Sequence, residues 1–226
     1  MYILGIDTST KFLCVVIAKD GRVLSHYKRI HERAHGQLLI SVIDKLLKKN
    51  ALAVYDLDCL AVDTGPGSFT GIRIGLATVK GLSMVLKIPV IDIPSLDLLA
   101  FSLRDKYDLI CPVIDAKRGY VYSALYQATA GSFKRQGKYF LGNIEKFLKK
   151  TKQKVAFTGD ALSIYRDQIK RINNSKAIFA PDKFWYPCPD TLAKLSFMLY
   201  KKAKIKTADE LSPLYLYPDT CTVQKK

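Results

Sequence analysis

Apolar runs and polar turns alternate over the first thirty residues of the chain, and this pattern predicts a small antiparallel unit. Three apolar runs predict strands over 2–6, 12–18 and 23–29. Asp20-Gly21 lies between the second and third runs and is typical of a tight hairpin. The period then changes, because leucine, valine and isoleucine recur at helical spacing and predict a helix over 35–49 that ends in lysines.

The next sixty residues predict parallel crossovers. Apolar segments predict strands over 57–62 and 90–93, with a helix over 71–86 between them and a short helix over 95–103 after them. The order is then β-β-β-α-β-α-β-α. This order mixes hairpins with crossovers, unlike the strict alternation of a Rossmann fold.

The second half of the chain repeats this order loosely. Its patterns predict strands over 112–115, 120–126, 133–140 and 155–157, and helices over 143–150, 162–171 and 191–204. Ile114-Asp115 echoes Ile6-Asp7, and Thr158-Gly159-Asp160 echoes Asp63-Thr64-Gly65. Such a duplication predicts an α/β fold of two similar lobes, 1–105 and 106–226, which face each other across a cleft.

A glycine-rich segment at 63–76 joins a predicted strand to a predicted helix. Gly65, Pro66 and Gly67 predict a tight loop, and Ser68 is placed to cap the helix. A strand, a glycine-rich turn and a helix N-terminus form a typical anion-binding corner. The spacing, however, fits neither the dinucleotide fingerprint nor the P-loop.

The helix after this loop favours a packing surface over a phosphate cradle. From 71 to 86 its only charges are Arg73 and Lys80, which lie seven positions apart on one stripe. Gly71, Gly75 and Thr78 place small residues on another face, where a second helix can approach closely. We expect Gly71 and Gly75 to form the contact itself, and the helix to be too short and too charged to span a membrane.

A polar cluster after the first strand is a candidate nucleotide site. Asp7-Thr8-Ser9-Thr10 offers a carboxylate for a metal and hydroxyls for phosphate oxygens, and the alternative is a simple turn between two strands. Together with the glycine-rich loop, the cluster gives six candidate nucleotide-binding residues: Asp7, Thr8, Ser9, Gly65, Gly67 and Ser68.

Two other motifs are weaker. His31-Glu32-Arg33-Ala34-His35 matches the zincin pattern, but it straddles a strand end and a helix start and no histidine follows it. Asp115-Ala116-Lys117-Arg118-Gly119 is expected to face the cleft, as a structural ion pair or a partner contact. Ser68 lacks a neighbouring histidine or acid. We therefore expect neither a catalytic residue nor a metal ligand.

Composition indicates which partners and which cellular compartment to expect. The formal net charge of +16 suggests acidic partners such as RNA, although lysine runs are also typical of solvated surfaces. The five cysteines never form C-x-x-C and are expected to be buried thiols in a reducing cytoplasm. The N-terminus lacks a basic region, and no run of about 20 apolar residues occurs, so we expect neither a signal peptide nor a membrane span.

Four segments together carry a resemblance to a known family. They are Ile6-Asp7-Thr8-Ser9, the glycine block 65–75, Ile114-Asp115-Ala116-Lys117-Arg118-Gly119-Tyr120-Val121-Tyr122, and Leu211-Ser212-Pro213-Leu214-Tyr215-Leu216. In this order they closely resemble the bacterial TsaB (YeaZ) family, from the N-terminus to about residue 218. Between 128 and 189 only the pattern of elements matches. Lys117 stands where the family usually has arginine, and Gly36 where it tends to have serine.

The resemblance implies an actin/Hsp70-like (ASKHA) fold and a role in making threonylcarbamoyladenosine (t6A) in tRNA. It implies a non-catalytic cytoplasmic subunit that binds and positions the catalytic paralogue TsaD, with TsaE as an ATPase partner. It implies no intrinsic cofactor and leaves open ATP or ADP at the complex interface, a homodimer of the chain alone, and tRNA contact within the complex. TsaD-like proteins carry a metal-binding histidine pair after the fifth strand, and 89–97 contains no histidine here.

The partner surface is expected on the helices over 35–49 and 71–86. Its candidate residues are Leu39, Val42, Ile43, Leu46, Gly71, Arg73, Gly75, Thr78 and Leu82. Two other classes of function stay open. One is an ATP-binding ASKHA-type enzyme, either a kinase or a protease-like hydrolase, and the other is a direct RNA-binding module.

Overall fold

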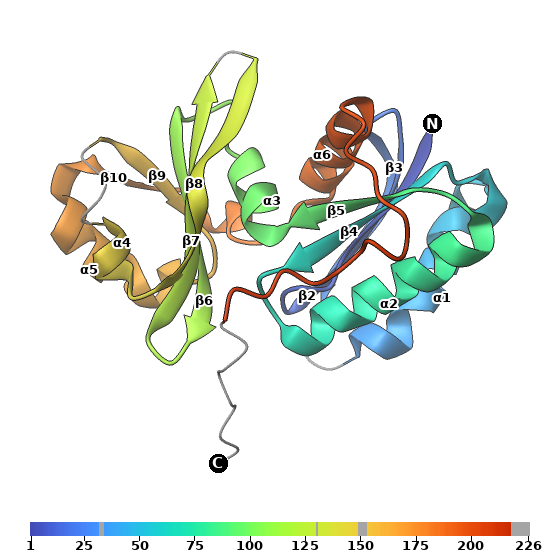
Figure 1. The fold of residues 1–226 in the computed structure, drawn as a ribbon, viewed down its shortest axis with the longest axis horizontal. Coiled ribbons are helices and arrows are strands. Elements are labelled where there is room, and N and C mark those ends of the chain that lie inside the picture. Colours follow the sequence, from blue (N-terminus) through green and yellow to red (C-terminus); the bar gives the residue numbers. More distant parts are fainter. Residues whose placement is uncertain (32–33, 130, 149–152, 218–226) are drawn as a thin grey trace.

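The computed structural model describes residues 1–31, 34–129, 131–148 and 153–217, and it contains two five-stranded mixed sheets (Figure 1). The strands are β1 (Tyr2–Asp7), β2 (Phe12–Lys19), β3 (Arg22–Ile30), β4 (Cys59–Gly65), β5 (Val90–Pro94), β6 (Leu109–Lys117), β7 (Tyr120–Thr129), β8 (Ser132–Gly142), β9 (Val155–Thr158) and β10 (Ala177–Phe179). The α-helices are α1 (His35–Lys49), α2 (Phe69–Leu86), α3 (Ser95–Phe101), α4 (Ile144–Leu148), α5 (Leu162–Asn173) and α6 (Pro189–Lys201).

The two sheets share one topology, which confirms the predicted duplication. The first has the order β3-β2-β1-β4-β5, and the second, read in the same sense, has β8-β7-β6-β9-β10. In each sheet the first strand of the repeat is central, antiparallel to the next strand and parallel to the fourth. Asp7 ends the first strand of one repeat and Asp115 lies near the end of its counterpart, as the sequence echo predicts.

Most predicted elements are confirmed, and the differences have local causes. The predicted bounds of α1 are confirmed, whereas α6 starts at Pro189 because proline suits the first helical turn. The three-residue strand β10 is too short to show a period and was not predicted. Parts of other predictions lie outside the described residues: Glu32, Arg33, Ala130, Lys149, Lys150, Lys152, Cys221, Lys225 and Lys226.

The first sheet is covered on both faces. Side chains that alternate along its strands, such as Leu4 and Ile6, pack under α1 and α2, while Ile3 and Val16 pack under α6. Period-2 alternation sends neighbouring residues to opposite faces, so near-continuous apolar strands are what a sheet covered on both sides needs. Cys14, Cys59 and Cys111 lie in the strands of the two sheets and are buried as predicted. Cys188, just before α6, is only partly buried, which corrects the prediction for that residue.

The third helix of each repeat contacts the sheet of the other repeat. α3 lies between the two sheets and contacts β6 and β7, whereas α6 packs on β1, β2 and β3 of the first sheet (Figure 1). Asp97 of α3 accepts hydrogen bonds from the Tyr126 and Tyr139 hydroxyls of the second sheet at 2.5 and 2.7 Å. Apolar packing and a polar cluster therefore join the two repeats. The division between 105 and 106 stays a prediction.

The segment after α6 runs back along the first sheet to the second (Figure 1). Val90 and Lys206 form an isolated antiparallel bridge, and the Leu214 amide donates to the Thr64 carbonyl at 2.8 Å. The Tyr217 hydroxyl then donates to the Ala116 carbonyl on β6 at 3.0 Å. The tail thus connects the ends of β4 and β6.

The start of α2 lies very close to the loop after β1. A Cβ atom on Gly71 would meet the Thr8 carbonyl oxygen at 1.9 Å, and one on Gly75 would meet the Thr8 hydroxyl at 2.6 Å. The Thr8 hydroxyl donates to the Gly71 carbonyl, and the Ser68 amide donates to the Ser9 carbonyl. The small residues of α2 therefore let the helix lie against its own chain. This corrects the expectation that Gly71 and Gly75 face a partner.

The opposite side of α2 is exposed and, apart from Arg73 and Lys80, mainly apolar. Across its 18 residues the mean hydropathy is 1.3, and only 33% of them are buried. By length and composition this is the one helix in the described residues that meets the requirements of a membrane span, so the expectation that it is too short and charged is wrong on that measure. Met84 and Val85 are 66% and 70% exposed.

Three glycines of α2 allow a matched test of the close approach. Gly71→Ala should lower the free energy of unfolding by about 1–3 kcal/mol, because the new methyl group meets backbone that cannot yield freely. Gly81→Ala should raise it by about 0.5–1 kcal/mol, because a Cβ there meets nothing within 4 Å and alanine favours helix. Urea unfolding measures both values. Equal effects of the two substitutions would contradict the close approach.

Candidate functional site

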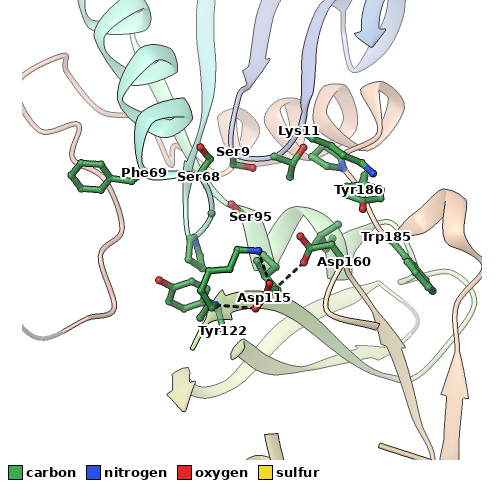
Figure 2. Close-up of a pocket in the computed structure, with 18 residues that line it drawn as sticks. Ser9, Lys11, Ser68, Phe69, Ser95, Asp115, Tyr122, Asp160, Trp185 and Tyr186 are labelled. Carbon is green, nitrogen blue, oxygen red and sulfur yellow. Dashed lines mark hydrogen bonds and ion pairs between the residues drawn. The ribbon is translucent and has the colours of Figure 1, made fainter. Parts of the chain in front are cut away.

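A cleft of about 470 Å³ lies between the two repeats (Figure 2). Ser9, Lys11 and Ser68 line it from the first repeat, and Asp115 and Asp160 line it from the second. Lys117, Thr10 and Ser95 add further polar groups. The rest of the wall is largely apolar or aromatic, and it includes Phe69, Leu99, Ile114, Tyr122, Trp185, Tyr186 and Pro187. The cleft offers hydroxyls, two carboxylates and two lysines next to flat aromatic faces.

The carboxylates of the second repeat are committed to local contacts. The Lys117 ammonium pairs with the Asp115 carboxylate at 2.6 Å, and Asp160 accepts a hydrogen bond from the Asp115 amide at 3.1 Å (Figure 2). Lys117 and Arg118 both have positive φ, at 64° and 53°, in the tight β6–β7 turn. Of the segment 115–119, Asp115, Ala116 and Lys117 line the cleft as predicted, whereas Arg118 and Gly119 do not. Of its two predicted roles, the structure contains the ion pair.

The corresponding carboxylates of the first repeat are sealed beneath the cleft. Asp7 and Asp63 are fully buried and absent from its wall. Asp7 Oδ1 accepts hydrogen bonds from the Ser9 amide and hydroxyl, both at 2.8 Å. Asp63 Oδ1 accepts from the Gly65 amide at 2.7 Å and from the Ser95 hydroxyl at 2.6 Å. These contacts fix the loop after β1 and the start of α3.

The burial of these two neighbouring carboxyls favours one proton between them. Burial raises the pKa of the Asp63 carboxyl well above its usual value, and the neighbouring Asp7 carboxylate raises that pKa further. Burial also raises the pKa of Asp7, against hydrogen bonds from Ser9 that lower it. Asp7 Oδ2 is buried and has no hydrogen-bond partner among the described residues, and a protonated Asp63 carboxyl would be able to donate to it.

The structure brings the six predicted nucleotide-binding residues together around one loop, but only half of them line the cleft. Ser9, Gly67 and Ser68 form part of its wall. Asp7 is sealed, the Thr8 hydroxyl is bonded to Gly71, and a Cβ at Gly65 would meet Ile72 at 2.7 Å. Sequence reasoning missed Lys11, Ser95, Trp185 and Tyr186, since nothing in their local spacing marks them.

The predicted partner residues separate into two groups. Leu39, Val42, Ile43 and Leu46 belong to the first core, and Gly71 and Gly75 face Thr8, which is a correction to their expected exposure. Arg73 is exposed, and Thr78 and Leu82 are partly exposed. Partner binding on α1 and α2 stays a prediction, with fewer of the predicted residues available for it.

The segment 211–216, which carries part of the family resemblance, has a role that its sequence did not reveal. The Tyr215 ring stacks on Phe69 at 5.5 Å, and its hydroxyl accepts a hydrogen bond from Arg73 Nε at 3.0 Å. The Arg73 guanidinium also lies 3.9 Å from the centre of the Phe69 ring. The tail therefore covers the first turn of α2 and holds its exposed arginine.

The zincin-like segment forms no metal site in the described part of the chain. His31 Nε2 lies 2.6 Å from the Tyr27 hydroxyl, and His35 begins α1, while Glu32 and Arg33 lie outside the described residues. Among the described residues, no group of three histidine, cysteine or acidic side chains is placed to hold a metal. Burial raises the pKa of the Cys59 and Cys111 thiols to about 12, which makes them poor nucleophiles.

Comparison with known proteins identifies relatives along nearly the whole chain. Residues 28–220 match the family model described as TsaD, tRNA N6-adenosine threonylcarbamoyltransferase. The tRNA threonylcarbamoyladenosine biosynthesis protein TsaB of Bacillus subtilis is 31% identical over 219 residues, which cover 96% of this chain and 94% of that protein. The protein of the same name from Escherichia coli is 35% identical over 129 residues, 56% of this chain and 55% of that protein.

Solved structures agree on the fold. YeaZ from Pseudomonas aeruginosa superposes with a TM-score of 0.83 at 25% identity, covering 95% of this chain and 99% of that one. A ROK hexokinase from Thermus thermophilus superposes with a TM-score of 0.53 at 10% identity, covering 90% of this chain and 99% of that one. The second likeness concerns the fold alone. The predicted ASKHA-type fold and the resemblance to the TsaB family are confirmed.

The buried acid pair predicts a specific pH dependence of stability. Because the folded-state pKa of Asp63 is raised, the folded chain keeps a proton that the unfolded chain releases, and stability falls as pH rises from about 4 toward that raised pKa. Asp63→Asn should make the free energy of unfolding less dependent on pH, by up to about 1.4 kcal/mol per pH unit. The reason is that the asparagine amide donates to Asp7 at every pH. Urea unfolding between pH 4 and 8 measures the slope.

Asp44 provides the matched control. Its carboxylate is on the surface of α1 and pairs with Lys48 at 2.8 Å, so Asp44→Asn should leave the slope almost as in the original chain. If the Asp63→Asn and Asp44→Asn curves run parallel, the shared proton is refuted.

Proposed function

Because this chain belongs to the TsaB family of tRNA threonylcarbamoyladenosine biosynthesis proteins, within the wider TsaD family, we propose that it is the non-catalytic subunit that binds and positions a TsaD-like transferase. A TsaE-like ATPase is proposed as a further partner of this pair. Family membership supports the process, and the surface of α2 supports the mode of action.

The exposed apolar side of α2 is the observation that carries the proposal. Ala77, Gly81 and Val85 recur every four residues on the side opposite the buried glycines, and Met84 lies next to them. An exposed apolar helix face of this kind marks a binding site in proteins that work in water. We name this face, made by Ala77, Gly81, Met84 and Val85, the α2 outer face.

The neighbouring helix extends this surface. Gly36 of α1 lies within van der Waals reach of the Ile74 side chain, so the two helices lie side by side. Ile40, one turn further along α1, is 58% exposed. Small residues at Ala77 and Gly81 would allow a partner helix to approach closely, and Ile40 and Val85 would supply apolar area at the core of the interface.

A catalytic role receives less support from the geometry. The acids of the first repeat are sealed, and Asp115 is paired with Lys117. These groups are committed to holding loops, which suits a positioning subunit better than an enzyme that must present a free carboxylate. Among the described residues, no three potential ligands gather as a metal site would need.

The interlobe cleft favours the second candidate, an ATP-binding enzyme of the ASKHA type. Its volume of about 470 Å³, its serine hydroxyls and its aromatic wall would accept a nucleotide. The same cleft is compatible with ATP or ADP in the assembled complex. The net charge of +16 supports a tRNA contact within the complex, and the α2 outer face supports a homodimer when the chain is alone.

Gly81→Leu tests the proposed surface without disturbing the fold. The leucine side chain would project into open space from the α2 outer face, so the chain should keep its unfolding midpoint. The amount of TsaD-like partner that co-purifies with it should fall at least about tenfold. Affinity capture from a co-expression strain measures the loss. Gly75→Leu is unsuitable, since it would displace Thr8.

Ser175→Leu is the matched control, because Ser175 is also small, uncharged and exposed but belongs to the second repeat. This variant should capture the partner as the original chain does. Undiminished capture by Gly81→Leu would refute the α2 outer face as the partner site.

A further inference from the structure

The β7–β8 hairpin forms one edge of the second sheet and extends beyond its other strands (Figure 1). In the described part of the chain β8 pairs with β7 alone, and Lys134, Gln136 and Lys138 of β8 are exposed. Between residues 116 and 144 the sequence has three lysines and two arginines but no aspartate or glutamate. The hairpin therefore carries positive charge with no acidic group of its own.

One face of the hairpin is occupied by the first repeat. Arg135 lies opposite Tyr126 in the strand register, and its guanidinium is 4.0 Å from the Asp97 carboxylate of α3. Side chains alternate between the two faces of a strand, so Lys134 and its opposite residue Gln127 lie on the other face. This other face points away from the first repeat.

A short helix covers only one end of this other face. The Phe147 ring of α4 lies 5.1 Å from the Phe140 ring, close to the end of β8. In the first repeat α1 has 15 residues and packs on β2 and β3, whereas the described part of α4 has five. The rest of the face is open to solvent. We name it the basic hairpin face, made by Gln127, Lys134, Gln136 and Lys138.

The lysines of the basic hairpin face have no local counter-charge. Neither Lys134 nor Lys138 lies within 4.0 Å of a carboxylate oxygen in the described part of the chain. The Gln136 amide donates to the Gln127 side-chain oxygen at 2.9 Å, which holds the two amides beside the lysines. Ammonium groups can only donate hydrogen bonds, so this surface is suited to an anion that offers several acceptors.

Two features favour a polyanion over a protein partner here. Exposed lysines, the positive φ of 78° at Gly137 and an irregular register protect the edge of β8 against pairing with another strand. Among the described residues from 121 to 142, no large hydrophobic side chain is exposed, and a protein interface needs an apolar core. Binding to a phosphate backbone needs only cationic and hydrogen-bonding side chains.

We propose that the basic hairpin face binds the phosphate backbone of an RNA. That this RNA is a tRNA rests on the proposed function, whereas the surface itself uses only groups of this chain. The basic hairpin face belongs to the second repeat and the α2 outer face to the first. The two surfaces are therefore separate, and one chain can hold an RNA and a protein partner at the same time.

The test measures binding of an unmodified tRNA transcript to the full chain by fluorescence anisotropy, between about 50 and 200 mM potassium chloride. Affinity should fall steeply as salt rises, because phosphate contacts release counterions. The double variant Lys134→Gln/Lys138→Gln should bind at least about tenfold more weakly. Its slope of log affinity against log salt should be smaller by about 1.4–1.8, the loss expected for two phosphate contacts.

The double variant Lys201→Gln/Lys202→Gln is the matched control, because these lysines are exposed at the end of α6, outside the hairpin. It removes the same charge and should keep the salt slope of the original chain. Equal losses in the two double variants would overturn the proposal. Absence of tRNA binding by the chain, both alone and in complex with the TsaD-like protein, would also overturn it.

Two further measurements separate this proposal from its alternatives. Gly81→Leu should bind tRNA as the original chain does, so failure of the α2 outer face as the partner site would leave the RNA surface standing. Polyglutamate is the probe for an acidic protein partner. Tighter binding of polyglutamate than of tRNA, lost in Lys134→Gln/Lys138→Gln, would assign the face to an acidic protein and overturn the RNA proposal.

Discussion

The close approach of α2 to the loop after β1 is the constraint on which the rest of this structure depends. Gly71 and Gly75 remove the atoms that would otherwise collide with Thr8, and the helix therefore rests directly on the polar loop. One side of α2 therefore packs within the chain, and the other side lies at the surface. Along its length α2 also contacts α1, which covers the same face of the first sheet.

The two repeats are joined by exchanged elements instead of a single linker. α3 packs between the two sheets and contacts strands of both, and α6, from the second repeat, packs on the first sheet. The tail adds a third connection from β4 to β6. This arrangement places the cleft between well-anchored walls, and the buried Asp7–Asp63 pair holds the loop and the helix that form one of them.

The sequence was a good guide to elements and a poorer guide to the direction in which side chains face. Apolar periodicity predicted α1 and most of the strands, and the repeated aspartates predicted the duplication, because these signals are local. The small-residue stripe of α2 indicated close packing correctly, but the partner in that packing is Thr8, 63 positions away from Gly71. The cleft residues Trp185 and Tyr186 meet Ser9 only through the fold, so no local pattern could mark them.

We propose that this chain acts by positioning a catalytic partner and does not carry out the chemistry. The most direct measurement is formation of threonylcarbamoyladenosine on tRNA by a purified TsaD-like protein with its ATPase, in the presence and absence of this chain. We expect modification only when the chain is added to the partner and its ATPase, and none from the chain alone. Modification by the chain without the TsaD-like protein, or equal modification whether or not the chain is present, would contradict it.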